Sequence, residues 1–338
     1  MSDDRLRIGL AGAGWVSEHH LDAWGALDSR AIVAAIADPD ARAAQTRAAK
    51  YKISSVYASV EDMLNTAALD AIDLATPVET HAHICRLAAD RGVAILCQKP
   101  MARSVSEAES LIADVGRRVP FMVHENWRFR PHYRQIQSWL RDGCIGDVRT
   151  AALSVLTSGL LPDDSGALPA LVRQPNLAAL DRMLLMEILI HQVDVLRFLL
   201  GPLSLQAAQL GTSCLAIKGE DRAALFMSSS DGAAVALVGD FMAHGYPPQA
   251  SDRLELLGTR GSIFLREDEL RITGEVEEVI PLDLAANYKA SYRNAFTHFL
   301  DGLESGSFET SPQDNLETLR IVEAAYENER VRSRSRSR

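Results

Sequence analysis

Two carboxylates and an imidazole recur at helical spacing in an apolar stretch of the second half of the chain: Glu187, His191 and Asp194. On an α-helix, at about 100° per residue, these side chains fall within about 60° of one another. His191 is then suited to take the proton of a substrate hydroxyl as hydride leaves the carbon, while Glu187 orients it and Asp194 contacts the substrate. The same stripe could instead be the solvent face of a core helix, and this helix alone does not decide between the two.

The element that must carry these residues is predicted as one helix over Met183–Leu200, because the segment is apolar and stops at Gly201 and Pro202. Its length approaches a membrane span, but its ionisable side chains would be costly in hydrocarbon, so a core helix is expected. Glu187 and His191 could supply two metal ligands. No further cluster of His, Cys or Asp completes such a set, and the four cysteines are widely spaced, so no metal site is expected.

A lysine in the first half, Lys99, stands between the apolar segment 93–97 and Pro100. There it could hydrogen-bond a substrate hydroxyl, polarise a carbonyl or pass a proton. A lone lysine after a strand is more often a surface residue, so the case for Lys99 depends on its surroundings.

The start of the chain has the spacing of a dinucleotide-binding turn. An apolar strand runs into Gly12 and Gly14, and a helical pattern begins at Trp15 and Val16. Gly12 permits a tight turn, and Gly14 lets the backbone approach a pyrophosphate that the helix N-terminus stabilises. Ser17 stands where the simplest fingerprint has Gly or Ala, so the motif alone is weak evidence.

An acid at the end of the second apolar segment strengthens this interpretation. Asp38 follows residues 31–37 at about the distance from the glycines that a ribose-binding carboxylate requires. Its charge would repel a 2′-phosphate, so NAD is expected rather than NADP, although Arg42 lies near enough to weaken this preference. The alternative role for Asp38 is that of a turn residue before Pro39.

The rest of the first half alternates strand and helix patterns, which predicts βαβ units and a doubly wound parallel (Rossmann) sheet. Strands are expected at 71–75, 93–97 and 121–124. Cofactors lie at the carboxyl ends of such strands. That edge should hold Thr76, Pro77, His81, Gln98 and Lys99.

From about residue 147 the pattern changes to short alternating segments, which predicts a C-terminal α+β domain on a largely antiparallel, open sheet, closed by helices near 291–303 and 312–330. The expected domains are 1–126 for the dinucleotide and 127–330 for substrate and oligomerisation. An open apolar face needs covering, so a homo-oligomer, dimer or tetramer, is expected. The Arg–Ser repeat suggests a disordered tail over 331–338.

Composition excludes some partners. The formal net charge of −10 argues against binding to nucleic acid, and no signal peptide or membrane anchor is recognised, so a cytoplasmic protein with free thiols is expected.

Several motifs in this order resemble the Gfo/Idh/MocA oxidoreductases. They are Gly12-Ala-Gly14, Ala75-Thr-Pro77, Gln98-Lys99-Pro100, Asn126-Trp-Arg-Phe129, Gly143-Cys-Ile-Gly146 and Glu187-x-x-x-His191-x-x-Asp194. The resemblance covers almost the whole chain. It implies that Lys99 is the lysine of the family's Glu-Lys-Pro motif, that His191 is the catalytic histidine, and that Asn126 and Arg128 lie near the substrate. Two residues depart from the pattern, because Gln98 replaces a glutamate and Glu187 an aspartate.

The function expected from the resemblance is NAD(P)-dependent hydride transfer between nicotinamide and a hydroxyl or carbonyl carbon of a sugar, a polyol such as an inositol, or a related hydroxy compound. Two alternatives stay open. One is a sensor or regulator that binds the dinucleotide without turnover. The other is a hydrolase or lyase that oxidises and re-reduces its substrate with tightly held NAD.

Overall fold

The computed structural model describes the backbone of residues 4–336 and the side chains through Val331. The chain forms two compact units, and each combines two separate stretches of sequence: Met1–Arg130 with Tyr288–Leu319, and Pro131–Asn287 with Arg320–Arg338. The predicted domains were 1–126 and 127–330, whereas Tyr288–Leu319 cluster with the first unit in the structure.

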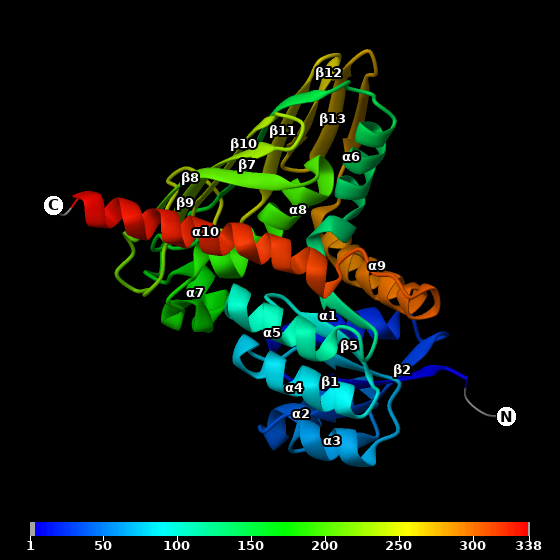
Figure 1. Ribbon diagram of the computed structural model, residues 1–338. Helices are drawn as coiled ribbons and strands as arrows, with labels where there is room; N and C mark the ends of the chain where they lie inside the picture. The colour runs from blue at the N-terminus through cyan, green and yellow to red at the C-terminus, as the bar shows by residue number, and fades with distance from the viewer. Residues whose placement is uncertain (1–3, 337–338) are drawn as a thin grey trace. The chain divides into compact units, whose positions relative to one another are not determined.

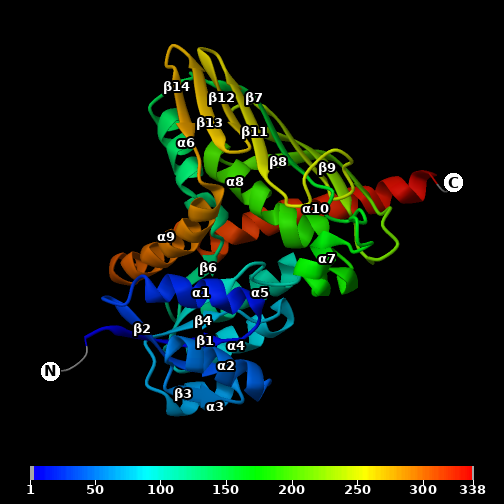
Figure 2. The same cartoon turned by 180° about the vertical axis from the view of Figure 1, so that it is seen from behind.

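The first unit is built on a six-stranded sheet in the order β3-β2-β1-β4-β5-β6, with every neighbouring pair parallel. Helices cover both of its faces, with α4 and α5 in front in Figure 1 and α1 in front in Figure 2. The predicted doubly wound sheet is therefore confirmed. Its elements are β1 (Leu6–Ala11), α1 (Trp15–Gly25), β2 (Ala31–Ala37), α2 (Ala41–Tyr51), β3 (Ser55–Tyr57), α3 (Val60–Thr66), β4 (Ala71–Leu74), α4 (Val78–Asp90), β5 (Ala94–Gln98), α5 (Val105–Val115) and β6 (Phe121–His124).

A helix from late in the sequence completes the core of this unit. In α9 (Leu284–Ser305), the buried residues Tyr292, Phe296 and Phe299 recur at the three- and four-residue spacing that forms one apolar stripe. They pack in one cluster with residues of the parallel sheet such as Ile8 and Met122. This packing explains why the first unit includes Tyr288–Leu319, which lie far beyond the predicted boundary at residue 126.

The last helix, α10 (Pro312–Arg336), extends further than the sequence suggested. It runs through most of the segment 331–338 that the Arg–Ser repeat predicted to be disordered. Residues 337–338 of that segment lie outside the described part of the chain.

The second unit is built on an eight-stranded sheet in the order β14-β13-β12-β11-β7-β10-β9-β8. Within the described strands of this sheet only the β7–β10 pair is parallel, which confirms the predicted, largely antiparallel sheet. Helices α6 (Pro131–Arg141) and α8 (Ile190–Leu200) lie over one face, in front in Figure 1 and behind the strands in Figure 2. The strands are β7 (Val148–Leu156), β8 (Leu203–Gly211), β9 (Arg222–Ser229), β10 (Ala234–Asp240), β11 (Asp252–Gly258), β12 (Gly261–Arg266), β13 (Glu269–Gly274) and β14 (Glu278–Pro281).

The predicted single α-helix over Met183–Leu200 is wrong in its first half, where Leu184–Leu189 form a π-helical turn that leads into α8. Glu220 holds the start of this turn, because its backbone oxygen accepts from the Leu184 N–H at 3.2 Å and its carboxylate from the Leu185 N–H at 2.8 Å. A π-turn contains more residues than an α-turn, so the angle expected between Glu187 and the residues of α8 does not apply. Among the described helices, none combines the length and hydropathy that a membrane crossing requires.

Candidate functional site

The turn after β1 requires glycine at its first position. Gly12 has φ +99°, and a Cβ there would lie 2.4 Å from the carbonyl oxygen of Ala75. Because β1 and β4 are neighbours, this is also the point at which the strand order of the sheet reverses. The fold itself therefore demands Gly12, at the place where doubly wound sheets bind their cofactors.

The fold does not require glycine at position 14, because Gly14 has φ −67° and an added Cβ would meet no atom within 4 Å. It is the N-cap of α1, and no side chain caps that helix end. The next residue, Trp15, is 49% exposed, while Val16 packs against the core. Open space in front of uncapped N–H groups is what a pyrophosphate needs, so these residues fit a dinucleotide.

The carboxylate of Asp38 is fixed beside the same turn. One oxygen accepts from the Ala13 N–H at 2.7 Å, and the other accepts from the Asp40 N–H at 2.8 Å. A carboxylate has about four acceptor positions, so ribose hydroxyls can still bind to it. The turn role therefore leaves acceptor positions of Asp38 available, and its ribose role stays a prediction.

His81 connects the loops that follow β4 and β5. Its ring nitrogens lie 2.9 Å from the backbone oxygen of Thr76 and 3.0 Å from that of Pro100, and the side chain is buried. Pro77, beside Thr76, is the N-cap of α4. The predicted cofactor-binding role of His81 is therefore expected to be indirect, through the shape of the two loops.

A buried polar chain supports the end of β5. Asp73 accepts from the indole N–H of Trp24 at 2.8 Å, and both of its oxygens lie 2.9 Å from Nδ1 of His20. The other ring nitrogen of His20 lies 3.2 Å from the side-chain amide nitrogen of Gln98. The side-chain oxygen of Gln98 accepts a hydrogen bond from the backbone N–H of Lys99 at 2.8 Å. Gln98 thus fixes the backbone from which the Lys99 side chain departs.

A functional candidate that sequence reasoning missed is Glu125. Strands β5 and β6 are in register with Gln98 opposite His124, so Lys99 and Glu125 follow the last pair of the two neighbouring strands. The Glu125 carboxyl is fully buried, and burial raises its pKa to about 7 even though the charge of Lys99 lowers it. The available signal was an acid directly after an apolar strand, at the same sheet edge as Lys99.

Asn126 and Arg128 are both almost fully buried. The Asn126 amide donates to the Ser291 hydroxyl at 2.8 Å. The Arg128 guanidinium forms an ion pair with Asp314 at 2.7 Å and donates to the Glu309 backbone oxygen at 3.2 Å. These bonds tie the segment after β6 to the late residues of the first unit, and the substrate contacts of Asn126 and Arg128 stay a prediction.

In the second unit, His191 is 6% exposed and Asp194 is fully buried, whereas Glu187 in the π-turn is partly exposed. Beside them the Gln192 amide donates to Asp252 at 2.8 Å. Neither His191 nor Asp194 lies on an exposed stripe, which removes the alternative of a solvent face. Lys99 belongs to the first unit and His191 to the second, so their meeting at one substrate remains a prediction.

Comparisons with known proteins cover both units. Residues 6–119 match the model described as the oxidoreductase family, NAD-binding Rossmann fold, and residues 133–264 match that of the GFO/IDH/MocA C-terminal domain. A D-apiose dehydrogenase from Paraburkholderia graminis is 32% identical to this chain in an alignment that covers 95% of this chain and 87% of that protein. An inositol 2-dehydrogenase from Rhizobium meliloti is 28% identical over 95% of this chain and 96% of its own length.

The chain is also similar to a solved structure over almost its whole length. The crystal structure of an oxidoreductase from Agrobacterium radiobacter in complex with NAD+, L-tartaric acid and magnesium is 28% identical to this chain. It aligns with a TM-score of 0.88 over 96% of both chains.

Proposed function

Because the chain belongs to the Gfo/Idh/MocA oxidoreductases and carries their NAD-binding Rossmann domain, we propose that it oxidises a secondary hydroxyl of a small sugar or polyol with NAD+. The predictions of family and cofactor class are confirmed. The proposal rests mainly on one observation about the first unit. Lys99 follows β5, and the open turn at Gly14 follows β1, two strands away at the same edge of the sheet. Relatives named for D-apiose and inositol support this substrate class.

The residues of the chain then have distinct roles. Bound nicotinamide supplies the hydride acceptor. Lys99 donates a hydrogen bond to the substrate hydroxyl and stabilises the charge that develops on its oxygen. His191 accepts the hydroxyl proton, Glu187 orients the imidazole, and Asp194 contacts a further hydroxyl.

This function is tested by following NADH formation with a panel that includes D-apiose, myo-inositol and tartrate. We expect at least one sugar or polyol to give NADH at a rate proportional to enzyme concentration. Binding of NAD in calorimetry without NADH from any compound would instead indicate a sensor. Product formed without net NADH would indicate a hydrolase or lyase that re-reduces its substrate.

A substitution at Asp38 tests the choice between NAD and NADP. Asp38→Asn is expected to weaken NAD binding by about 10- to 100-fold, because hydrogen bonds to a charged acceptor contribute about 1.5–3 kcal/mol. It should affect NADP less, since the charge that repels a 2′-phosphate is gone. Calorimetric Kd values for both cofactors check this, with Asp114→Asn, an exposed partner of Arg86, as the control. Equal NAD affinity of Asp38→Asn and wild type would contradict the ribose role.

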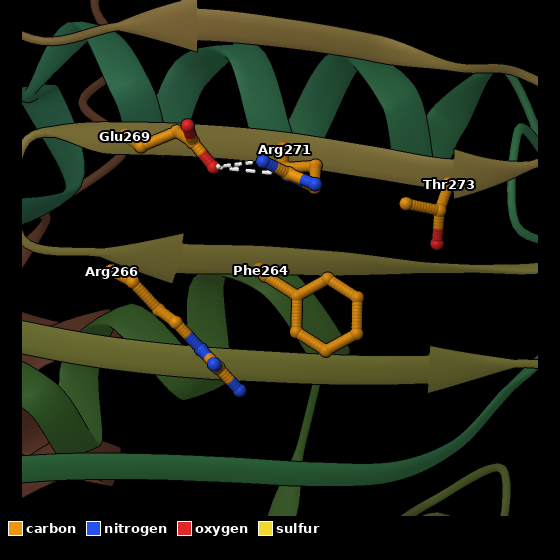
Figure 3. Close-up of a pocket in the computed structure, with 5 residues that line it drawn as sticks. All are labelled: Phe264, Arg266, Glu269, Arg271 and Thr273. Atoms are coloured by element: carbon orange, nitrogen blue, oxygen red, sulfur yellow. Dashed lines mark hydrogen bonds and ion pairs between the residues drawn. The ribbon is translucent and has the colours of Figure 1, made fainter.

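The open sheet face supports the proposed oligomer. Cross-strand pairing places Phe226, Val238, Leu257, Phe264 and Val279 on one face of the second unit. Four of them are 38–51% exposed, the exception being Phe264. Figure 3 shows a hollow on this face, with side chains of β12 and β13 turned away from the helix behind them. It is lined by Phe264, Arg266, Glu269, Arg271 and Thr273.

This hollow contains none of the predicted site residues, so we assign the face to a second copy of the chain rather than to substrate. Phe226→Glu is expected to shift the protein to monomer, because burying an unpaired charge costs several kcal/mol. Light scattering with size-exclusion chromatography measures the mass. The control is Val172→Glu, which places the same charge on α7 (Pro169–Arg173), off the sheet. An unchanged mass for Phe226→Glu would remove this face from the interface.

The four cysteines, Cys85, Cys97, Cys144 and Cys214, are all free thiols. Free thiols persist in a reducing compartment, which supports a cytoplasmic location. Recovery of the protein with periplasmic or secreted markers in cell fractionation would contradict that location.

A further inference from the structure

We propose that the buried carboxyl of Glu125 is the charge partner of the Lys99 ammonium and positions it for reaction. This inference rests on the proposed function for its catalytic consequence, but the pairing itself can be tested without a substrate. Glu125 is a positioning residue, since it acts through Lys99.

The neighbour of Lys99 in sequence does not supply a counter-charge. Gln98 stands where the resembled motif has a glutamate, and its amide is neutral. Its oxygen already accepts from the Lys99 backbone N–H, and its nitrogen lies 3.2 Å from His20. A carboxylate that pairs with the ammonium therefore comes from an element other than β5.

Strand β6 places one there. Gln98 pairs with His124 across the parallel ladder, so the next residue on each strand is Lys99 and Glu125. The Trp127 N–H donates to one oxygen of Glu125 at 3.2 Å, which holds the carboxyl in the bend after β6. A fully buried carboxylate is costly unless it is paired, and Lys99 places a cation at the same sheet edge, directly after the neighbouring strand.

The charges around Glu125 favour the same pairing. Burial raises its pKa to about 7, and Lys99 is the largest influence that lowers the pKa, ahead of Arg128 and Arg130. Burial holds the pKa of the Tyr292 phenol on α9 well above its ordinary value, and the charge of Glu125 raises it further. The ring of His124, the residue before Glu125, contacts the Tyr292 ring in a tilted arrangement, with centroids 5.1 Å apart. With a pKa near 7 the carboxyl changes charge near neutral pH, and its anion forms an ion pair with the ammonium that the neutral acid does not.

The pairing is tested by NMR titration of the whole protein with isotope-labelled glutamate carboxyl carbons. We expect one carboxyl with a midpoint near pH 7, absent in Glu125→Gln. In Lys99→Met its midpoint should move to higher pH, because the cation that lowers the pKa is gone. Lys50→Met, which removes an exposed lysine paired with Glu18, is the control and should leave the midpoint unchanged. An unchanged midpoint in Lys99→Met would overturn the pairing, whatever the substrate proves to be.

Kinetics with the substrate found in the panel test the positioning role. Glu125→Gln is expected to lower kcat by about 10- to 100-fold, with a smaller change in KM, because a misplaced reactive group slows chemistry more than binding. Glu125→Asp keeps the charge and should recover at least part of this loss. Glu107→Gln, on α5 and paired with Arg103, is the control and should match wild type. A kcat for Glu125→Asp no higher than for Glu125→Gln, with both variants folded in thermal melting, would overturn the role of the charge.

Discussion

Lys99→Met is expected to lower kcat/KM by about 10²- to 10⁴-fold, because it removes the donor that stabilises charge on the substrate oxygen while leaving NAD binding largely intact. His191→Asn should cause a loss of similar size, since it removes the proton acceptor. Steady-state NADH formation gives the rates, and calorimetry with NAD shows that the cofactor still binds. Full activity in both variants would contradict the assigned roles.

The double variant shows whether the two residues act on the same substrate, although they belong to different compact units. Groups that act as one catalytic set are strongly non-additive. Lys99→Met with His191→Asn should therefore be only slightly slower than either single variant. Losses that multiply would mean that the two side chains act independently, and the proposed joint site would then be wrong.

Gly12→Ala and Gly14→Ala are expected to differ sharply, although the two glycines stand two residues apart. At Gly12 the left-handed backbone costs about 1–2 kcal/mol for an L-residue, and the clash of Cβ with the Ala75 oxygen adds about 1–3 kcal/mol. Gly12→Ala should therefore lower the melting temperature and bind NAD poorly. Gly14→Ala should melt like wild type, because the space around it is open.

The loss in Gly14→Ala should instead appear in cofactor binding. A methyl group would occupy the space through which a pyrophosphate approaches the start of α1, so the NAD Kd should rise by about tenfold or more. Calorimetry and thermal melting of both variants, with Gly25→Ala as a control at an open position, separate the two effects. Wild-type affinity in Gly14→Ala would place the pyrophosphate elsewhere.

Local patterns predicted much of this fold. The strand expected at 121–124 is observed as β6 with the same bounds, and the helices expected near 291–303 and 312–330 are observed as α9 and α10. Short-range signals suffice here, because alternation, turns and caps are properties of neighbouring residues.

Other features depend on contacts that local patterns do not contain. A helix was predicted near 291–303, but its apolar stripe at Tyr292, Phe296 and Phe299 does not say which sheet it will cover. The π-turn before α8 forms where Glu220, distant in sequence, binds the helix start. Glu125 was missed because an acid after a strand is usually a turn residue, and its burial becomes evident only when β5 and β6 are paired.

The return of α9 to the first unit has a consequence for biosynthesis. A ribosome releases the sheet strands β1–β6 long before it has made Phe296 and Phe299, which bury one face of that sheet. Domains usually fold in the order in which they are translated. Here the apolar surface of the nucleotide-binding sheet stays uncovered until the segment around Phe296 and Phe299 has emerged. Chaperone binding to nascent chains should therefore persist until that segment is made.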